Sequence, residues 1–254
     1  MPVSVHRNPA ARHPRVQTLI PQRYTQHIDS MTIFDYPHYE ATRKSRLRNF
    51  FHHFDVGSLA GKRILEVGCG TGDLGQAFVD VGCRVVSVDA RAEYIEELNR
   101  RYPDRETYTK DLECWNPRLL GPFDGLLCWG LLYHLSAPGD FLTACAGVAP
   151  LIFLETAVSD SMDAVCPLTD EEGPDQAWSG KGCRPSPAWL QQHLSALGFE
   201  VRDISTVEAN WDGPSPSVFD WVPLHDGQWQ RNGAMLRKML IGTRWNKAHS
   251  NATP

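Results

Sequence analysis

Residues 63–75 read Arg63-Ile64-Leu65-Glu66-Val67-Gly68-Cys69-Gly70-Thr71-Gly72-Asp73-Leu74-Gly75, and this stretch decides the predicted fold. Its apolar start predicts a strand that ends near a carboxylate, and three glycines at alternate positions predict a turn before a helix. Glycine suits such a turn because it adopts positive φ and lets a ligand lie against bare backbone. The following helix would direct its unpaired N–H groups and the positive end of its dipole at that ligand.

A second strand is predicted at residues 84–88, and it ends at Asp89. A carboxylate at the tip of the second strand can accept hydrogen bonds from both hydroxyls of a ribose. The two strands, the glycine turn and this acid together predict a nucleoside-binding crevice.

The spacing of the glycines indicates which nucleoside binds. A dinucleotide site has the pattern G-x-G-x-x-G, whose glycines fit a pyrophosphate. This chain instead has E-x-G-x-G-x-G from Glu66 to Gly72, with an acid where a pyrophosphate would be repelled. Glu66 is better suited to a cationic amino group, such as that of the methionine part of S-adenosylmethionine. The segment resembles motif I of the class I S-adenosylmethionine-dependent methyltransferases, and Asp89 is similar to their ribose-binding acid.

Strands and helices alternate after this motif, which is typical of a parallel sheet with crossover helices. Strands are expected near residues 63–67, 84–88, 106–110, 124–129 and 151–155, and helices near 72–81, 91–101, 139–147 and 187–197. The resemblance implies a seventh, antiparallel strand, and residues 235–241 are a plausible edge strand. The predicted fold class is therefore α/β, a Rossmann-like, mainly parallel seven-stranded sheet with helices on both faces.

The chain is expected to hold one domain with additions, which suits its 254 residues. We expect an irregular basic tail at 1–30, a lid helix region at 31–56, the cofactor-binding domain at 57–245 and a C-terminal tail at 246–254. The helix of the lid region would have a basic outer face. Two long segments, 157–187 and 208–233, are expected to be acceptor loops, because loops beside a crevice carry specificity.

Composition excludes some classes of protein. The net charge of −5 gives no overall basic field for nucleic acid, and no apolar run is long enough to cross a membrane. Seven scattered cysteines without a C-x-x-C pair disfavour a zinc knuckle and are typical of reduced thiols. We therefore expect a cytoplasmic protein with no metal and no membrane contact, as a monomer or homodimer.

The resemblance implies a set of cofactor-binding residues. Those near the methionine end are Glu66, Gly68, Cys69, Gly70, Gly72, Trp129 and Gly130. Those near the adenosine are Asp89, Ala90, Arg91, Asp111 and Leu112.

Tyr133 and His134 follow the fourth strand and are the candidate catalytic residues. An imidazole can take a proton from a hydroxyl or an amine near neutral pH. Three roles stay open for His134: proton abstraction, acceptor binding without proton transfer, and structural packing. A base is needed only for a poorly acidic acceptor, because holding the nucleophile and the methyl group in line supplies much of the acceleration.

The candidate substrate-binding residues share a place near the expected acceptor side, and they are Tyr36, Tyr39, Glu155, Arg184 and Trp221. The segment around Arg184, residues 182–190, resembles a group that includes small-molecule methylases and tRNA wobble-uridine carboxymethyltransferases. Arg184 would meet an acceptor anion or pair with the acidic stretch before it. Ser186 is expected to cap the helix that follows.

The favoured function is methyl transfer from S-adenosylmethionine to an O or N atom of a small-molecule acceptor, since the chain is acidic and its second loop is aromatic. One alternative is an RNA (tRNA)-modifying methyl- or carboxymethyltransferase whose basic tail and residues 43–48 touch phosphates. Another is a non-catalytic, cofactor-binding regulatory protein.

Overall fold

The computed structural model describes residues 32–173, 176–206, 217–218 and 235–244. The chain divides into two units, Met1–Thr32 and Ile33–Pro254, and every helix and strand below belongs to the second. The predicted tails at 1–30 and 246–254 lie outside the described residues.

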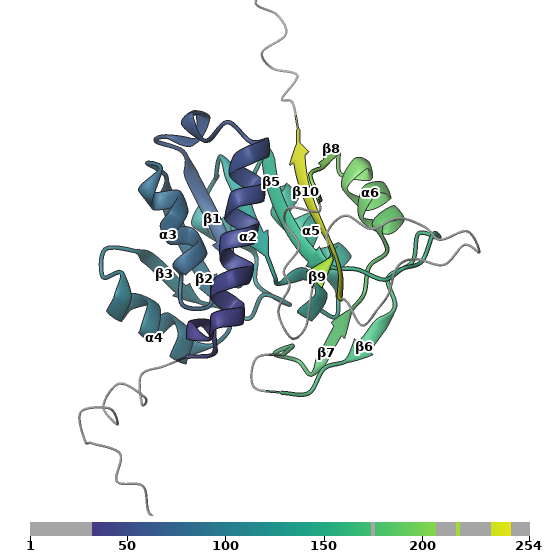
Figure 1. Cartoon of the computed structure of the whole chain (residues 1–254), viewed down its shortest axis with the longest axis horizontal. Coiled ribbons are helices and arrows are strands. Elements are labelled where there is room, and N and C mark those ends of the chain that lie inside the picture. Colours follow the sequence, from purple (N-terminus) through teal and green to yellow (C-terminus); the bar gives the residue numbers. More distant parts are fainter. Residues whose placement is uncertain (1–31, 174–175, 207–216, 219–234, 245–254) are drawn as a thin grey trace, which may run out of the picture. The chain divides into compact units, whose positions relative to one another are not determined.

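The main sheet has its strands in the order β3-β2-β1-β4-β5-β10-β8 (Figure 1), and a short β9 pairs with β10. Strands β1 to β5 run parallel to one another, whereas β10 is antiparallel to both β5 and β8. Their bounds are Arg63–Val67 (β1), Arg84–Asp89 (β2), Glu106–Thr109 (β3), Gly125–Trp129 (β4), Leu151–Ala157 (β5), Glu200–Asp203 (β8), Ser217–Val218 (β9) and Met235–Thr243 (β10). The prediction of a mainly parallel seven-stranded sheet is confirmed, with β9 as an addition.

The sequence suggested that residues 235–241 form an edge strand, but the structure shows that they do not. Strand β10 lies between β5 and β8, and residues 240–243 pair with residues 200–203 on its outer side. Its central side chains are correspondingly buried, with Met239 only 1% and Ile241 only 3% exposed.

Alternate residues of the strands face opposite sides of the sheet, as the pleat requires. In β4, Leu126 and Cys128 belong to one apolar cluster, and Leu127 and Trp129 to another. The first cluster contains side chains of α5 (Pro138–Ala146) and α6 (Pro187–Ala196), and the second those of α2 (Pro37–His53) and α3 (Asp73–Asp80). A further helix, α4 (Ala92–Arg101), packs on β2 and β3. Helices therefore cover both faces, as predicted.

Helix α2 is packed into the core through its C-terminal half. Phe50 is fully buried, and its ring lies 4.8 Å from Phe153 and 5.3 Å from Trp129, centroid to centroid. The Asn49 side-chain amide donates to the carbonyl of Ile204 at 2.7 Å. The C-terminal half of this helix is therefore part of the core.

The first predicted acceptor loop, 157–187, contains a small sheet of its own (Figure 1). Strands β6 (Leu168–Asp170) and β7 (Lys181–Cys183) form an antiparallel pair that is separate from the main sheet. We call residues 168–183 the β6–β7 hairpin. The second predicted loop, 208–233, lies outside the described residues except for β9.

Four 3-10 helices complete the described secondary structure: η1 (Ile33–Asp35), η2 (Val56–Leu59), η3 (Pro117–Leu120) and η4 (Leu132–His134). In the parts of the chain with assigned positions, none of the helices combines the length and the apolar character needed to cross a membrane.

Candidate functional site

The turn after β1 requires glycine at three positions. Gly68, Gly70 and Gly72 have φ of 64°, 52° and 80°, in the left-handed region. A Cβ at Gly70 would lie 2.6 Å from the Phe34 ring, and one at Gly72 would lie 2.6 Å from the Leu98 side chain. The turn is therefore bare backbone, and Gly72 begins α3 as its N-cap.

Asp89 holds the tip of β2 against this turn. Its Oδ2 accepts the Gly70 N–H at 2.9 Å, and its Oδ1 accepts the Arg91 N–H at 3.0 Å. Burial raises the pKa of Asp89, although the same two N–H groups oppose the shift. Two backbone donors do not exhaust the acceptor capacity of a carboxylate, so Asp89 can still accept from a ligand.

A cavity opens above the carboxyl ends of β1, β2 and β4, where the strand order reverses between β1 and β4. Ligands bind at such a switch point in open parallel sheets. The expected site residues that line the cavity are Tyr39, Gly68, Cys69, Asp89, Ala90, Arg91, Asp111, Leu112, Trp129, Gly130, Tyr133 and His134.

Six expected site residues are not part of this lining, and they are Tyr36, Glu66, Gly70, Gly72, Glu155 and Arg184. Gly70 and Gly72 shape the turn rather than face the cavity. Tyr36 is 49% exposed and stacks on His38. Trp221 lies outside the described residues.

Glu66 faces the core beneath the turn instead of the cavity, which differs from the expected contact with a ligand amine. Its carboxylate accepts the Gly75 N–H at 2.7 Å and the Ser87 hydroxyl at 2.6 Å, and Arg105 lies 3.6 Å away. Burial raises the pKa of Glu66 to about 7, against the opposing effects of Ser87 and Arg105. The side chain thus links β1 to α3 and β2.

Glu155 was expected to contact an acceptor, but its side chain has no exposed surface in this structure. Its Oε2 lies 2.7 Å from Arg46 Nη2 and 2.9 Å from Arg237 Nη2, and Oε1 contacts Arg237 Nε. Burial alone would raise the pKa of Glu155, but Arg237 and Arg46 outweigh it and lower the pKa. The buried Arg237 and the partly exposed Arg46 share this one carboxylate.

The basic face of α2 turns partly inward, contrary to the expectation of a basic outer face. Tyr39, Arg43 and Arg46 follow one another at helical spacing, and all three line the cavity. Arg46 is held there by Glu155, and a Cβ on Gly130 would lie 3.2 Å from its Nη2. Only Lys44 and Arg48 of residues 43–48 are exposed.

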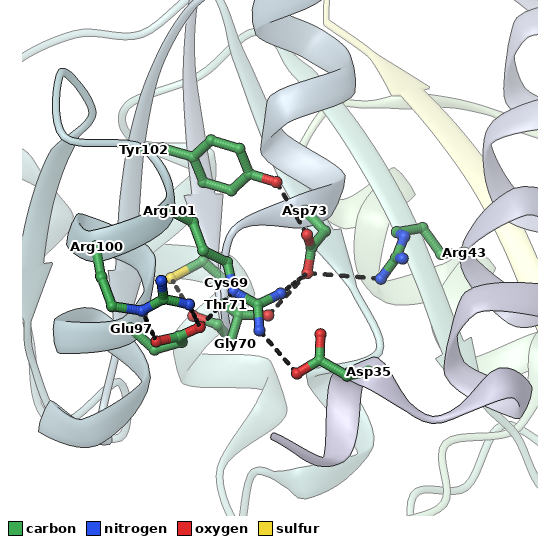
Figure 2. Close-up of polar contacts among 10 residues, drawn as sticks. All are labelled: Asp35, Arg43, Cys69, Gly70, Thr71, Asp73, Glu97, Arg100, Arg101 and Tyr102. Carbon is green, nitrogen blue, oxygen red and sulfur yellow. Dashed lines mark hydrogen bonds and ion pairs between the residues drawn. The ribbon is translucent and has the colours of Figure 1, made fainter. Parts of the chain in front are cut away.

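A network of polar contacts around Asp73 surrounds the start of α3 (Figure 2). Asp73 accepts hydrogen bonds from the Thr71 hydroxyl at 2.8 Å and the Tyr102 hydroxyl at 2.9 Å. Arg43 Nη1 and Arg101 Nη1 lie 3.5 and 3.4 Å from its Oδ2. Asp73 therefore connects α2 and α4 at the end of the glycine turn.

His134 is paired with Glu171 of the β6–β7 hairpin. Its Nδ1 contacts Glu171 Oε2, and Glu171 Oε1 lies 2.8 Å from Arg184 Nη1. Burial alone would raise the pKa of Glu171, but His134 and Arg184 lower it, so the carboxylate is ionised. Of the two roles considered for Arg184, pairing with the preceding acidic stretch is the one that the geometry shows.

The same hairpin reaches the opposite side of the cavity. Arg91 Nη2 donates to the carbonyl of Gln176 at 2.7 Å, and its guanidinium lies 5.4 Å from the centroid of the Trp178 ring. Gln176 and Trp178 line the cavity. The predicted cap of α6 is confirmed, since Ser186 Oγ accepts the Trp189 N–H at 3.1 Å.

Several cavity residues were not expected from the sequence: Ile33, Phe34, Arg43, Arg46, Thr71, Asp73, Leu74, Tyr94, Glu113, Leu131, Leu135, Gln176 and Trp178. The helical spacing of Arg43 and Arg46 from Tyr39 could have predicted that all three lie on one face of the helix. Glu171 had no such signal, because it lies 37 residues from His134 along the chain. Within the described ranges, no three His, Cys, Asp or Glu side chains gather in a way that would hold a metal ion.

Residues 36–204 match a family model described as a methyltransferase domain. The ubiquinone biosynthesis O-methyltransferase of Bordetella parapertussis is 30% identical over 101 residues, which are 37% of this chain and 41% of that protein. The protein of the same name from Rhodopseudomonas palustris is 26% identical over 166 residues, covering 61% and 65% of the two chains. The chain thus covers less than two thirds of each of these relatives.

Solved structures share the fold. The N-terminal domain of EvdMO1 with bound SAH has a TM-score of 0.59 at 20% identity, covering 80% of this chain and 81% of that one. The 1,6-didemethyltoxoflavin-N1-methyltransferase of Burkholderia thailandensis has a TM-score of 0.51 at 18% identity, covering 95% and 94%. With the family model spanning β1 to β8 and most of the cavity, the chain belongs to the methyltransferase domain family.

Proposed function

We propose that this protein transfers a methyl group from S-adenosylmethionine to an O or N atom of a small-molecule acceptor. The observation that carries the proposal is the hydrogen bond from the Gly70 N–H to Asp89. It holds a carboxylate that can accept hydrogen bonds from ribose hydroxyls beside the bare backbone of the glycine turn. Tyr133 and His134 line the same cavity, so donor and acceptor would share it.

The residues present fit S-adenosylmethionine. Asp89 has acceptor capacity left for ribose hydroxyls, and Asp111 and Leu112 line the cavity where an adenine would follow. Gly68 and Gly130 bring bare backbone to the expected methionine end, both at positive φ. S-Adenosylmethionine supplies an activated methyl group on a sulfonium that leaves as a neutral thioether.

The residues of the chain would bind the cofactor, orient the acceptor and exclude water. Phe34, Tyr94 and Trp178 line the cavity around the expected adenosine. Their aromatic rings can pack against a purine and exclude water from it. Arg46 presents positive charge near Gly130, where an anionic group would be held. Tyr133 and His134 face the space left for the acceptor, and fixing it in line with the methyl group lowers the barrier.

A small-molecule acceptor is favoured over RNA. The cavity lies between α2 and the β6–β7 hairpin, and two arginines of residues 43–48 point into it rather than outward to phosphates. The ubiquinone biosynthesis and toxoflavin enzymes named above are small-molecule methyltransferases by name. A cytoplasmic location and a monomeric or dimeric state remain predictions.

Two measurements test the proposal. Calorimetry should show binding of S-adenosylhomocysteine, and failure to bind it or S-adenosylmethionine would overturn the proposal. Binding of the cofactor without methylation of any acceptor would favour the non-catalytic alternative. Methyl-tritiated S-adenosylmethionine, incubated with catechols, phenolic acids, alcohols, amines and bulk tRNA in parallel, should label a small molecule. Label found in tRNA alone, with binding that falls steeply as salt rises, would instead support the RNA-modifying alternative.

A further inference from the structure

We propose that Glu171 positions the His134 imidazole as a general base, and that the acceptor atom is the oxygen of a hydroxyl group. This inference rests on the proposed methyl transfer and specifies its acceptor. Glu171 would be a positioning residue, since it reaches the cavity only through His134.

The contacts of Glu171 determine which nitrogen of His134 carries the proton. The Glu171 side chain is 3% exposed, and its Oε2 contacts His134 Nδ1 and also accepts the Ala177 N–H at 3.2 Å. Arg184 Nη1 lies 2.8 Å from Oε1. An ionised carboxylate only accepts hydrogen bonds, so Nδ1 must donate. A neutral His134 then has its lone pair on Nε2.

The other ring nitrogen is free for an acceptor. His134 lines the cavity with its side chain 16% exposed. Among the described residues, Nε2 has no hydrogen-bond partner, whereas Nδ1 is occupied by Glu171. This is the arrangement of a carboxylate-oriented imidazole base, recognised by its geometry rather than by sequence position.

The C-terminal end of the β6–β7 hairpin and the adjoining Arg184 pack against η4, which contains His134. A Cβ at Gly182 would lie 2.4 Å from the Tyr133 carbonyl oxygen and 2.8 Å from Glu171 Cδ, so only glycine permits this approach. The Cys183 thiol donates to the Leu132 carbonyl at 3.4 Å. Arg184 Nη1 donates to the Tyr133 carbonyl at 3.3 Å. These contacts fix Glu171 against η4.

The chemistry of a base indicates a hydroxyl acceptor. A neutral amine already has a free lone pair and can lose its proton after attack, whereas a hydroxyl oxygen becomes a strong nucleophile as its proton leaves. The O–H proton passes to His134 Nε2, and the oxygen bonds the methyl carbon with the electron pair it keeps. The methyl–sulfur bond breaks with its electrons remaining on sulfur, and the imidazolium returns the proton to water.

Nitrogen-15 NMR of the histidine rings tests the inference without any acceptor. At a pH where the ring is neutral, the His134 signals of the unaltered protein, assigned by their loss in His134→Gln, should show a proton on Nδ1 and a bare Nε2. A proton on Nε2 in the unaltered protein overturns the inference. This result does not depend on whether a Glu171 variant folds.

A Glu171→Gln variant should weaken the preference for a proton on Nδ1. It removes the charged acceptor at Nδ1, and the Ala177 N–H competes with Arg184 for the amide oxygen, so a neutral His134 should populate both tautomers. Glu172→Gln, an exposed neighbour on the same hairpin, is the matched control and should leave the ring as it is. An unchanged tautomer in Glu171→Gln would overturn the positioning role.

Rates with two probes test the base directly. Glu171→Gln should slow methylation of catechol by about 100-fold or more, the usual contribution of a general base. The loss should be smaller with 4-nitrocatechol, whose hydroxyl ionises more easily. Equal losses with both probes, or methylation of amines alone, would overturn the inference. Binding of S-adenosylhomocysteine separates the outcomes, because a failure of the proposed function abolishes it in the unaltered protein, whereas a failure of this inference does not.

Discussion

The Gly70 N–H and Asp89 Oδ2 are 2.9 Å apart, so the tip of β2 is hydrogen-bonded to the turn that follows β1. Gly70 follows β1 and Asp89 ends β2, two neighbouring parallel strands whose register pairs Val67 with Val88. This bond holds a carboxylate and a stretch of bare backbone on one side of the cavity. It therefore connects the geometry of the fold to the proposed binding of a nucleoside.

Replacing Asp89 tests that connection. Asp89→Ala should weaken binding of S-adenosylhomocysteine by roughly 1–3 kcal/mol, the range for hydrogen bonds to a charged group. Isothermal titration calorimetry measures the change. Asp104→Asn, an exposed acid, is the control and should bind as the unaltered protein does. Equal affinities for all three proteins would remove Asp89 from the binding site.

Replacing His134 should separate catalysis from cofactor binding. His134→Gln is expected to keep the affinity for S-adenosylhomocysteine and to lower turnover with the labelled acceptor by about 100-fold or more, since it removes a positioned base. The exposed His52, changed to Gln, serves as the control. If His134→Gln keeps its full rate between about pH 6 and pH 9, the base assignment is wrong.

The buried ion cluster should be important for stability. Glu155→Gln leaves Arg46 and Arg237 without their shared carboxylate and should lower the free energy of unfolding by about 3–5 kcal/mol. Asp203→Asn breaks the more exposed pair with Lys238 and should cost less than about 1 kcal/mol. Urea unfolding of both variants gives the comparison. Similar losses in the two would contradict the burial argument.

Glu66 should make the protein less stable as pH rises. Its pKa is about 7 in the folded state against 4.5 for an ordinary glutamate, so the folded state binds this proton more tightly than the unfolded chain. The contribution to stability is complete below about pH 4.5 and is lost as pH rises through 7. A shift of this size corresponds to about 3 kcal/mol.

Urea unfolding at several pH values between about 5 and 8 measures this contribution. The free energy of unfolding should fall with pH more steeply for the unaltered protein than for Glu66→Gln, which has no proton to lose. Asp104→Asn should keep the original slope. Parallel curves for the unaltered protein and Glu66→Gln would show that burial does not raise the pKa of Glu66.

Local chemistry along the chain was enough to predict the first five strands, the glycine turn and Asp89, whereas the seven-stranded sheet was implied by the family resemblance. Short apolar runs indicated the strands, and Gly68, Gly70 and Gly72 fill positions where only glycine avoids strain. Most of the expected lining, from Gly68 to His134, follows from the rule that ligands lie at the carboxyl ends of parallel strands. These features depend on neighbours in sequence or on strand order.

Only the folded chain decides which charged groups meet. Arg46 pairs with Glu155, and His134 pairs with Glu171. Both pairs are far apart in the sequence, and no periodic pattern predicts either of them. Glu66 was expected to face a ligand, yet it turns beneath the helix because Gly75 and Ser87 offer it partners there. A buried carboxylate must find donors, and which donors are near is set by how β1, α3 and β2 pack together.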